Sequence, residues 1–239
     1  MISIVTGTLN RKNLLPNLIK NTVDSNDKLE LVLVDGGSSD GTIEYLEGLN
    51  HSRIKLIKVG SRSPYPHFMN LGIENSTYEW VCQWNDDALL VNDWSEVISE
   101  ITDEFDFYLF NWKYGTVEQM TNVSWLNGTD VSKSNGGWCL LDKSLEGGEI
   151  VVNYGLYNKK IFKDIGLYNN QYKYYYADGD MSIRSHCFGY KHKSLYDIKV
   201  CSVITPKTAT HHHNDKKIYD ENIRNYRSKK LSNTIKKLR

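Results

Sequence analysis

Two adjacent carboxylates, Asp86 and Asp87, follow a short apolar run within residues 80–87, Trp-Val-Cys-Gln-Trp-Asn-Asp-Asp. A buried strand that stops on adjacent acids places negative charge at the carboxyl edge of a sheet, where open α/β sheets bind their ligands. Neighbouring carboxylates repel each other, and both stay ionised only beside a positive charge. A divalent cation with oxygen ligands supplies that charge and can in turn hold phosphate groups. The alternative is a solvated loop that carries two acids.

A second acidic segment, residues 176–184, reads Tyr-Ala-Asp-Gly-Asp-Met-Ser-Ile-Arg. A carboxylate such as Asp178 can take the proton from a hydroxyl group while that oxygen attacks another centre. Asp180 is the rival for this role, although orienting the loop or pairing with Arg184 suits it better. The sequence nominates no nucleophile for a double displacement, so we expect a single displacement with one general base.

A third carboxylate, Asp35, ends the apolar run of residues 29–34. An acid at a strand end can accept hydrogen bonds from ribose hydroxyls or from the N–H of a base, as acids do in other nucleotide-binding folds. Thr6 and Thr8, at the end of the first apolar run, can offer hydroxyl and backbone groups to the same ligand. Together these residues favour a nucleotide.

Three consecutive histidines, His211, His212 and His213, come late in the chain. Histidine is a common metal ligand, and in an extended segment His211 and His213 would share one face. The three are therefore candidates for a functional role; the alternative is an exposed polar loop. A zinc site made from histidines alone is disfavoured, because no further His or Cys has the usual spacing.

These residues need a scaffold that gathers strand ends. We expect strands at residues 2–6, 29–34, 54–59 and 79–84, and helices within 14–23, 42–49 and 68–75. Alternating strands and helices predict a doubly wound α/β fold with a mostly parallel sheet and right-handed crossovers. The acids would then lie along one edge of that sheet.

The second half of the chain has a looser pattern. We expect helices at residues 94–101, 157–165 and 178–189, and strands at 106–112 and 198–204. Residues 115–149 are rich in Gly, Asn, Ser and Trp, and a long irregular stretch is usually functional or mobile. We expect one domain, residues 1–215, followed by a basic helical tail at residues 216–239.

Five motifs in order resemble those of the inverting family 2 glycosyltransferases of the GT-A fold, over about residues 2–213. They are Thr-Gly-Thr at 6–8 with Asn-Arg at 10–11, Val-Asp-Gly-Gly-Ser-Ser-Asp-Gly-Thr at 34–42, Met-Asn-Leu-Gly-Ile at 69–73, Asn-Asp-Asp at 85–87 and the segment 176–184. The fourth is similar to the family's metal motif and the last to the segment that supplies its catalytic base. Two positions depart from the family: Asn85 stands where Asp is common, and Ala177 where Glu is common.

The resemblance implies a metal-dependent glycosyltransferase that moves a sugar from a nucleotide-diphosphate donor, with UDP-sugars favoured, to a hydroxyl acceptor with inversion. Asp178 is then the general base, and Asp87 binds Mn²⁺ or Mg²⁺ together with His211 and His213. The implied nucleotide-binding residues are Thr6, Gly7, Thr8, Arg11, Asp35, Asn70 and Asp86. A catalytically inactive relative that binds a nucleotide sugar or a glycan is the alternative.

We expect the sugar or acceptor site at Gly137 and Trp138, because glycine allows close backbone approach and Trp can stack on a sugar face. The alternative there is a turn with a core Trp. Four tyrosines precede the base segment: Tyr172, Tyr174, Tyr175 and Tyr176. They either line an acceptor groove, or alternate ones pack inside while the others are solvated.

The totals of the sequence limit its partners. The 239 residues carry 29 Lys and Arg against 29 Asp and Glu, so the net charge is zero and a nucleic-acid binder is disfavoured. The start of the chain runs directly into a strand, so we expect no signal peptide and a cytoplasmic protein.

The predicted tail, residues 216–239, holds nine Lys or Arg against two acids. It suits peripheral contact with an anionic membrane, packing on the domain, or contact between copies of the chain. Expected acceptors are hydroxyls of a glycan, a lipid-linked sugar or a protein.

Overall fold

The structure of the protein is a computed structural model, and it describes residues 1–115, 140–142, 150–173, 175–203 and 213–237. Several residues singled out from the sequence lie outside these ranges: Gly137, Trp138, Tyr174, His211 and His212. The side chain of His213 is also outside the description. The predictions made for these residues therefore stay predictions.

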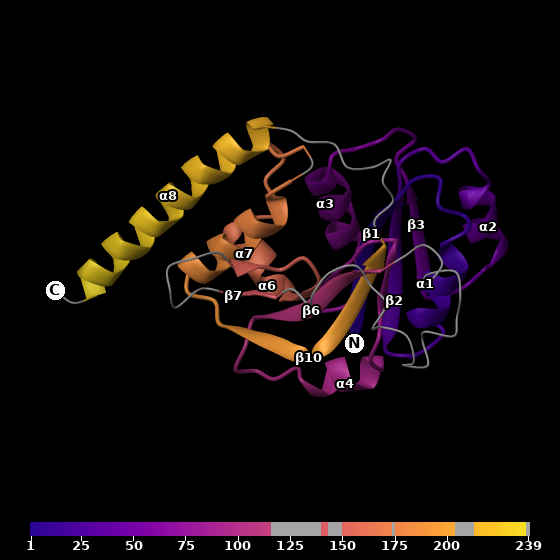
Figure 1. Cartoon of the computed structure of the whole chain (residues 1–239), viewed down its shortest axis with the longest axis horizontal. Helices are drawn as coiled ribbons and strands as arrows, with labels where there is room; N and C mark the ends of the chain where they lie inside the picture. Colours follow the sequence, from indigo (N-terminus) through magenta and orange to yellow (C-terminus); the bar gives the residue numbers. More distant parts are fainter. Residues whose placement is uncertain (116–139, 143–149, 174, 204–212, 238–239) are drawn as a thin grey trace.

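Among the described residues, eight strands form one sheet in the order β3-β2-β1-β4-β9-β6-β10-β5 (Figure 1). The strands are β1 (Ile2–Thr8), β2 (Leu29–Asp35), β3 (Ile54–Lys58), β4 (Trp80–Gln83), β5 (Ala88–Leu90), β6 (Phe107–Gly115), β9 (Gly155–Asn158) and β10 (His192–Val203). β1, β2, β3 and β4 run parallel to one another, and β6 runs parallel to β10. β9 is antiparallel to β4 and β6, and β5 is antiparallel to β10. β7 (Leu141–Asp142) and β8 (Ile150–Val151) form a separate pair. The predicted mostly parallel α/β sheet is confirmed.

Helices cover both faces of this sheet (Figure 1). They are α1 (Leu15–Asn21), α2 (Thr42–Gly48), α3 (Tyr65–Asn75), α4 (Trp94–Ser99), α6 (Lys159–Ile165) and α7 (Ala177–Cys187), and a last helix, α8 (His213–Lys237), packs on α7. β2 is buried along its whole length, as a central parallel strand with helices on both faces must be. Its register with β1 places Asp35 opposite Thr8, so the expected site residues of both strands meet at one edge.

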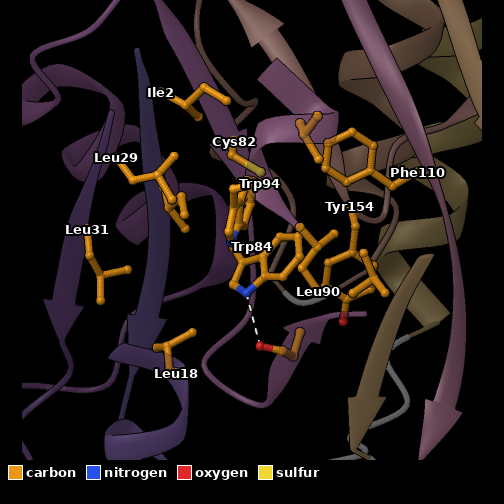
Figure 2. Close-up of a cluster of buried hydrophobic side chains, with 14 of the residues drawn as sticks. Ile2, Leu18, Leu29, Leu31, Cys82, Trp84, Leu90, Trp94, Phe110 and Tyr154 are labelled. Atoms are coloured by element: carbon orange, nitrogen blue, oxygen red, sulfur yellow. Dashed lines mark hydrogen bonds between the residues drawn. The ribbon is translucent and has the colours of Figure 1, made fainter. Parts of the chain in front are cut away.

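The apolar core has two parts, and strand alternation decides which residue joins which. Ile2 and Ile4 of β1 face the cluster under α1 and α4, whereas Val5 faces the cluster under α3 and α7. Figure 2 shows the first cluster, where the buried indole of Trp84 lies 5.4 Å from the ring of Trp94 and donates to the Ala88 carbonyl at 3.1 Å. Trp84 is thus a core residue that anchors the turn carrying Asp86 and Asp87, between β4 and β5.

The helix predicted at residues 157–165 is wrong at its start. Tyr157 and Asn158 belong to β9, and the helix begins at Lys159. Tyr157 is fully buried and stacks on Phe107 of the neighbouring strand, 5.5 Å between ring centroids. Asn158 then caps α6 by accepting from the backbone N–H of Lys160. A short apolar run does not distinguish a strand from a helix. Residues 155–158 form a strand because they pair with β4 on one side and β6 on the other.

The C-terminal helix α8 starts at His213, three residues before the predicted tail, and its first half packs on α7 (Figure 1). Tyr219 and Ile223 are buried there. Its second half runs outward from the sheet toward the C-terminus (Figure 1). The division of the chain at residue 215 stays a prediction. Within the described residues, no helix combines the length and apolar content needed to cross a bilayer.

Candidate functional site

A cavity of about 390 Å³ opens at the carboxyl ends of β1 and β2, beside the turn that follows β4. Its lining comes from four strand ends, from α3 and from the segment before α7: Gly7, Thr8, Leu9, Arg11, Val34, Gly36, Val59, Arg62, Ser63, Tyr65, Phe68, Asn85, Asp86 and Tyr175. This is the edge at which open α/β sheets bind ligands. Of the predicted nucleotide-binding residues, Gly7, Thr8, Arg11 and Asp86 therefore share one cavity.

The floor of the cavity depends on a glycine. A Cβ atom on Gly7 would lie 2.8 Å from the ring of Phe68, closer than real side chains approach. Glycine therefore lets α3 pack its aromatic ring against the end of β1. Tyr65 meets the same ring edge-on, 5.1 Å between centroids, and completes an aromatic wall.

The carboxylate of Asp35 is buried and already bonded within its own turn. It accepts from the backbone N–H groups of Gly37 and Ser38 at 2.8 and 2.9 Å and from the Ser38 hydroxyl at 2.5 Å. Gly36, the next residue, lines the cavity. Asp35 thus shapes the turn that borders the site, and its own contact with a nucleotide stays a prediction.

Thr6 and Asn70, two more predicted nucleotide-binding residues, have protein partners as well. Thr6 is buried and its hydroxyl donates to the Gly7 carbonyl at 3.0 Å. Asn70 of α3 donates to the carbonyl of Tyr168 and accepts from its backbone N–H, both at 2.9 Å. Neither lines the cavity, so their nucleotide contacts also stay predictions.

Asp86 and Asp87 form a charged cluster with Arg11 at the rim of the cavity. The guanidinium Nε of Arg11 lies 3.9 Å from a carboxylate oxygen of Asp86. Burial raises the pKa of Asp86 to about 6, although Arg11 and the Thr8 hydroxyl oppose that rise. Burial and then the charge of Asp86 raise the pKa of Asp87 to about 7, against the opposing effects of Arg11 and the Ser202 hydroxyl. Two buried acids with raised pKa values fit a cation, because added positive charge would stabilise both carboxylates.

The oxygen-rich character of this cluster matches Mg²⁺ or Mn²⁺ better than zinc. Asn85 lines the same rim and donates its side-chain amide to the Tyr154 hydroxyl at 2.9 Å. Across the described ranges, no three His, Cys, Asp or Glu side chains gather as a ready-made metal cluster. Asp86 and Asp87 are thus the described residues that could hold a cation.

Asp178 sits in the first turn of α7, where the positive end of the helix dipole favours a carboxylate. It accepts from the backbone N–H of Gly179 at 2.9 Å and from the side-chain amide of Asn153 at 3.3 Å. Burial first, and then the charge of Asp178, raise the pKa of the cavity residue Tyr65. Asp178 therefore acts electrostatically on the cavity wall, although it does not line the cavity itself.

Sequence reasoning missed Asn153 and the residues that hold it. Gln83, at the end of β4, donates to the carbonyls of Val152 and Asn153 at 2.7 and 3.1 Å and accepts from the Tyr168 hydroxyl. One signal in the sequence was Gly155. A Cβ atom at this position would lie 2.0 Å from the Tyr108 carbonyl oxygen. A glycine inside a β-forming run marks such a close approach.

The three described tyrosines near Asp178 differ in burial, and both interpretations made for the four tyrosines stay predictions. Tyr172 is fully buried, Tyr176 is half-buried, and Tyr175 is 39% exposed and lines the cavity. Arg62 and Ser63, which also line it, come from the turn after β3 and were not predicted. The cavity thus joins segments that lie far apart in the sequence.

Comparisons with known proteins bear on the family and the fold. Residues 3–166, more than half of the chain, match the family model described as glycosyl transferase family 2. No curated protein matches the sequence.

Solved structures share the fold at low sequence identity. The mannosyltransferase PcManGT from Pyrobaculum calidifontis, in complex with GDP-Man and Mn²⁺, has a TM-score of 0.62 at 16% identity, over 87% of this chain and 58% of its own. Residues 1–349 of S. aureus TarS, in complex with UDP-GlcNAc, have a TM-score of 0.66 at 17% identity, over 94% of this chain and 65% of their own. This chain therefore spans less than two thirds of the length of either relative.

Proposed function

The chain belongs to glycosyl transferase family 2, and from that premise we propose that it transfers a sugar from a nucleotide-diphosphate donor to a hydroxyl acceptor with inversion. The observation that carries the proposal is the acidic pair Asp86 and Asp87 beside Arg11, at the rim of a cavity of nucleotide size.

The nucleoside of the donor would occupy the cavity between Gly7 and the aromatic wall of Tyr65 and Phe68. The rim gives the diphosphate a cationic neighbour in Arg11 and a place for Mn²⁺ or Mg²⁺ at Asp87, with Asp86 beside it. Bound there, the cation would neutralise charge on the departing diphosphate. Support comes from the solved relatives, which were captured with GDP-Man and Mn²⁺ and with UDP-GlcNAc. We favour a UDP-sugar and place His211 and His213 as further candidates for the metal.

Asp178 would act as the general base. It takes the proton of the acceptor hydroxyl as that oxygen attacks the anomeric carbon, and the bond from that carbon to the diphosphate breaks on the opposite side. One displacement inverts the configuration. Asn153 and the Gly179 N–H hold the carboxylate before the acceptor arrives. We assign the sugar and acceptor contacts to Gly137 and Trp138. Tyr175, which lines the donor cavity, is a further candidate.

The first test of this proposal is ligand-induced stabilisation. UDP, GDP, dTDP and their sugars are each added with Mn²⁺, Mg²⁺ or EDTA, and the melting temperature is measured. A ligand that binds only the native state stabilises it by about 2.7 kcal/mol at one hundred times its Kd. We expect one nucleotide series to raise the melting temperature, and EDTA to abolish the effect. If no nucleotide changes the melting temperature, the proposal fails.

The second candidate function is that of an inactive binder, which is favoured by Asn85 in place of an acid in the metal motif. Two variants separate it from an enzyme. Asp87→Ala should lose metal-dependent nucleotide binding. Asp178→Asn should keep nucleotide binding and lose turnover by about 10²–10⁴-fold, the usual contribution of a general base. If the wild-type protein binds a nucleotide sugar but shows no turnover, it is a binding protein and not an enzyme.

A further inference from the structure

The carboxylate of Asp215, in the first turn of α8, holds the backbone just before α7. Its two oxygens accept from the N–H of Lys173 at 3.2 and 3.1 Å, and one of them also accepts from the N–H of Tyr175 at 3.1 Å. Asp215 is 1% exposed. A carboxylate that accepts several backbone N–H groups is a strong, charge-assisted clamp. We call Lys173 and residues 175–178 the base segment, because it leads into the proposed base.

A second contact joins α8 to the same segment through aromatic packing. The ring of Tyr219 lies 5.0 Å from the ring of Tyr176. A Cβ atom on Gly179 would lie 3.2 Å from the Tyr219 ring, so the two helices touch at the residue after Asp178. Tyr219 is buried at 5% exposure. The packing therefore fixes α8 against the first turn of α7 (Figure 1).

A third contact reaches the buried carboxylate of Asp180, two residues beyond the base. One of its oxygens accepts from the Tyr172 hydroxyl at 2.9 Å and, from α8, from Asn222 and Tyr226, both at 3.2 Å. Asp180 is fully buried and Arg184 lies 4.0 Å from its other oxygen. Both sides of Asp178 are thus tied to α8.

The base segment also contains a strained residue that needs support. Tyr176 has a φ of +68°, in the left-handed region that a bulky side chain seldom adopts. Such a conformation persists only where surrounding contacts over-determine it. Asp215 bonds the N–H of Tyr175, and Tyr219 packs on the Tyr176 ring, so α8 supplies those contacts.

We infer that Asp215 is a positioning residue for sugar transfer, and that α8 holds the base segment in place beside the cavity, whose wall includes Tyr175. This inference rests on the proposed function. Asp215 acts through the backbone and touches neither donor nor acceptor. Most of the donor cavity comes from residues 7–86, so loss of the clamp should impair the chemical step more than donor binding. A displacement of about 1 Å can cost about 10²-fold in rate.

The test compares Asp215→Ala, Asp215→Asn and the matched control Asp220→Asn. Asp220 lies on the same helix, exposed, in an ion pair with Lys216. Asparagine at 215 keeps one oxygen that can accept both N–H groups, so it should rescue the clamp. Amide hydrogen exchange is followed over residues 167–187, with residues 2–35 as the internal reference. Release of UDP from UDP-GlcNAc and of GDP from GDP-Man is measured with Mn²⁺, with water as the acceptor that takes the sugar.

We expect Asp215→Ala to speed exchange in residues 167–187 only. It should lower kcat by about 10²-fold while the donor KM stays within about twofold, which is the pattern of a lost transition-state interaction. Asp215→Asn and Asp220→Asn should resemble the wild type. Unchanged exchange, or faster exchange with unchanged kcat, would overturn the inference. If the wild type neither binds nor cleaves any donor, the proposed function fails and the role in transfer with it, whereas the exchange result still decides whether the clamp exists.

Discussion

At the residue scale, the candidate site is a set of acids whose environments differ sharply. Asp35 accepts hydrogen bonds from the backbone of its own turn, and Asp178 is held by an amide and a backbone N–H at a helix start. Asp86 and Asp87 are buried beside one guanidinium, which does not offset two charges. The buried charges of this pair lower the free energy of unfolding, and a bound cation would offset that loss.

The acidic pair predicts an unusual pH dependence of stability in EDTA. The pKa values of Asp86 and Asp87 are raised in the folded state, to about 6 and about 7, so the folded protein retains protons that the unfolded chain releases. Their contribution is therefore lost as pH rises from about 4 to about 7. Asp87→Asn should be as stable as the wild type at pH 4 and more stable than the wild type at pH 8 by up to about 4 kcal/mol, at about 1.4 kcal/mol per unit of raised pKa. Urea unfolding at both pH values checks this, and Mn²⁺ should remove the difference at pH 8.

Glu30 predicts the opposite behaviour. Burial alone would raise its pKa, but hydrogen bonds from Ser3, Thr77 and Lys55 outweigh burial and lower the pKa below its ordinary value. Stability from this carboxylate is thus present at neutral pH and is lost as pH falls below about 4. Glu30→Gln should cost about 1–3 kcal/mol at pH 7, and the difference from wild type should shrink at pH 3. An equal cost at both values would contradict a charged Glu30 in the fold.

At the element scale, the site depends on α3 lying close to β1. Phe68 covers Gly7 at the strand end, and one turn further along, Gly72 meets Val5. A Cβ atom on Gly72 would lie 2.2 Å from a methyl carbon of Val5. The glycine therefore sets the distance between the helix and the strand that together border the cavity.

Substitution of Gly72 tests this spacing. Gly72→Ala should destabilise the protein by about 1–3 kcal/mol, because the new methyl group overpacks a full core. Because the clash is with a side chain, adding Val5→Ala should recover part of the loss, so the double variant is more stable than the sum of the single variants predicts. Strict additivity in urea unfolding would show that Val5 is not the limiting contact.

At the scale of the whole molecule, the two halves of α8 have different surroundings. The first half of α8 ties down both sides of Asp178, and the second half runs outward from the body (Figure 1). Residues 229–239 carry five Lys or Arg and no acid. A projecting basic segment suits an anionic surface, with about 1 kcal/mol of attraction for each basic residue near it.

Removal of residues 229–239 should separate the two roles. We expect the full chain to sediment with vesicles that contain phosphatidylglycerol at low salt, and not with neutral phosphatidylcholine vesicles. The truncated chain should lose this binding and keep its stability, since the buried contacts of Tyr219 and Ile223 remain. Equal vesicle binding by both chains would assign the membrane contact elsewhere.

The sequence by itself determined the alternation of strands and helices, the mostly parallel sheet, the acids at strand ends and the family. Those features are local: apolar runs, turn glycines and the acids that follow them are written in neighbouring residues. Asp86, Arg11, Gly7 and Thr8 could be placed in one site because the ends of parallel strands meet at one edge.

Only the tertiary structure decided the rest, because it depends on contacts between distant residues. The strand β9, between β4 and β6, was hidden in a run that also fits a helix. Asn153 reaches Asp178 across 25 residues, and Asp215 reaches Tyr175 across 40. No periodicity encodes such pairs. They arise when packing brings separate elements together, so the contacts that hold Asp178 could be recognised only in the folded chain.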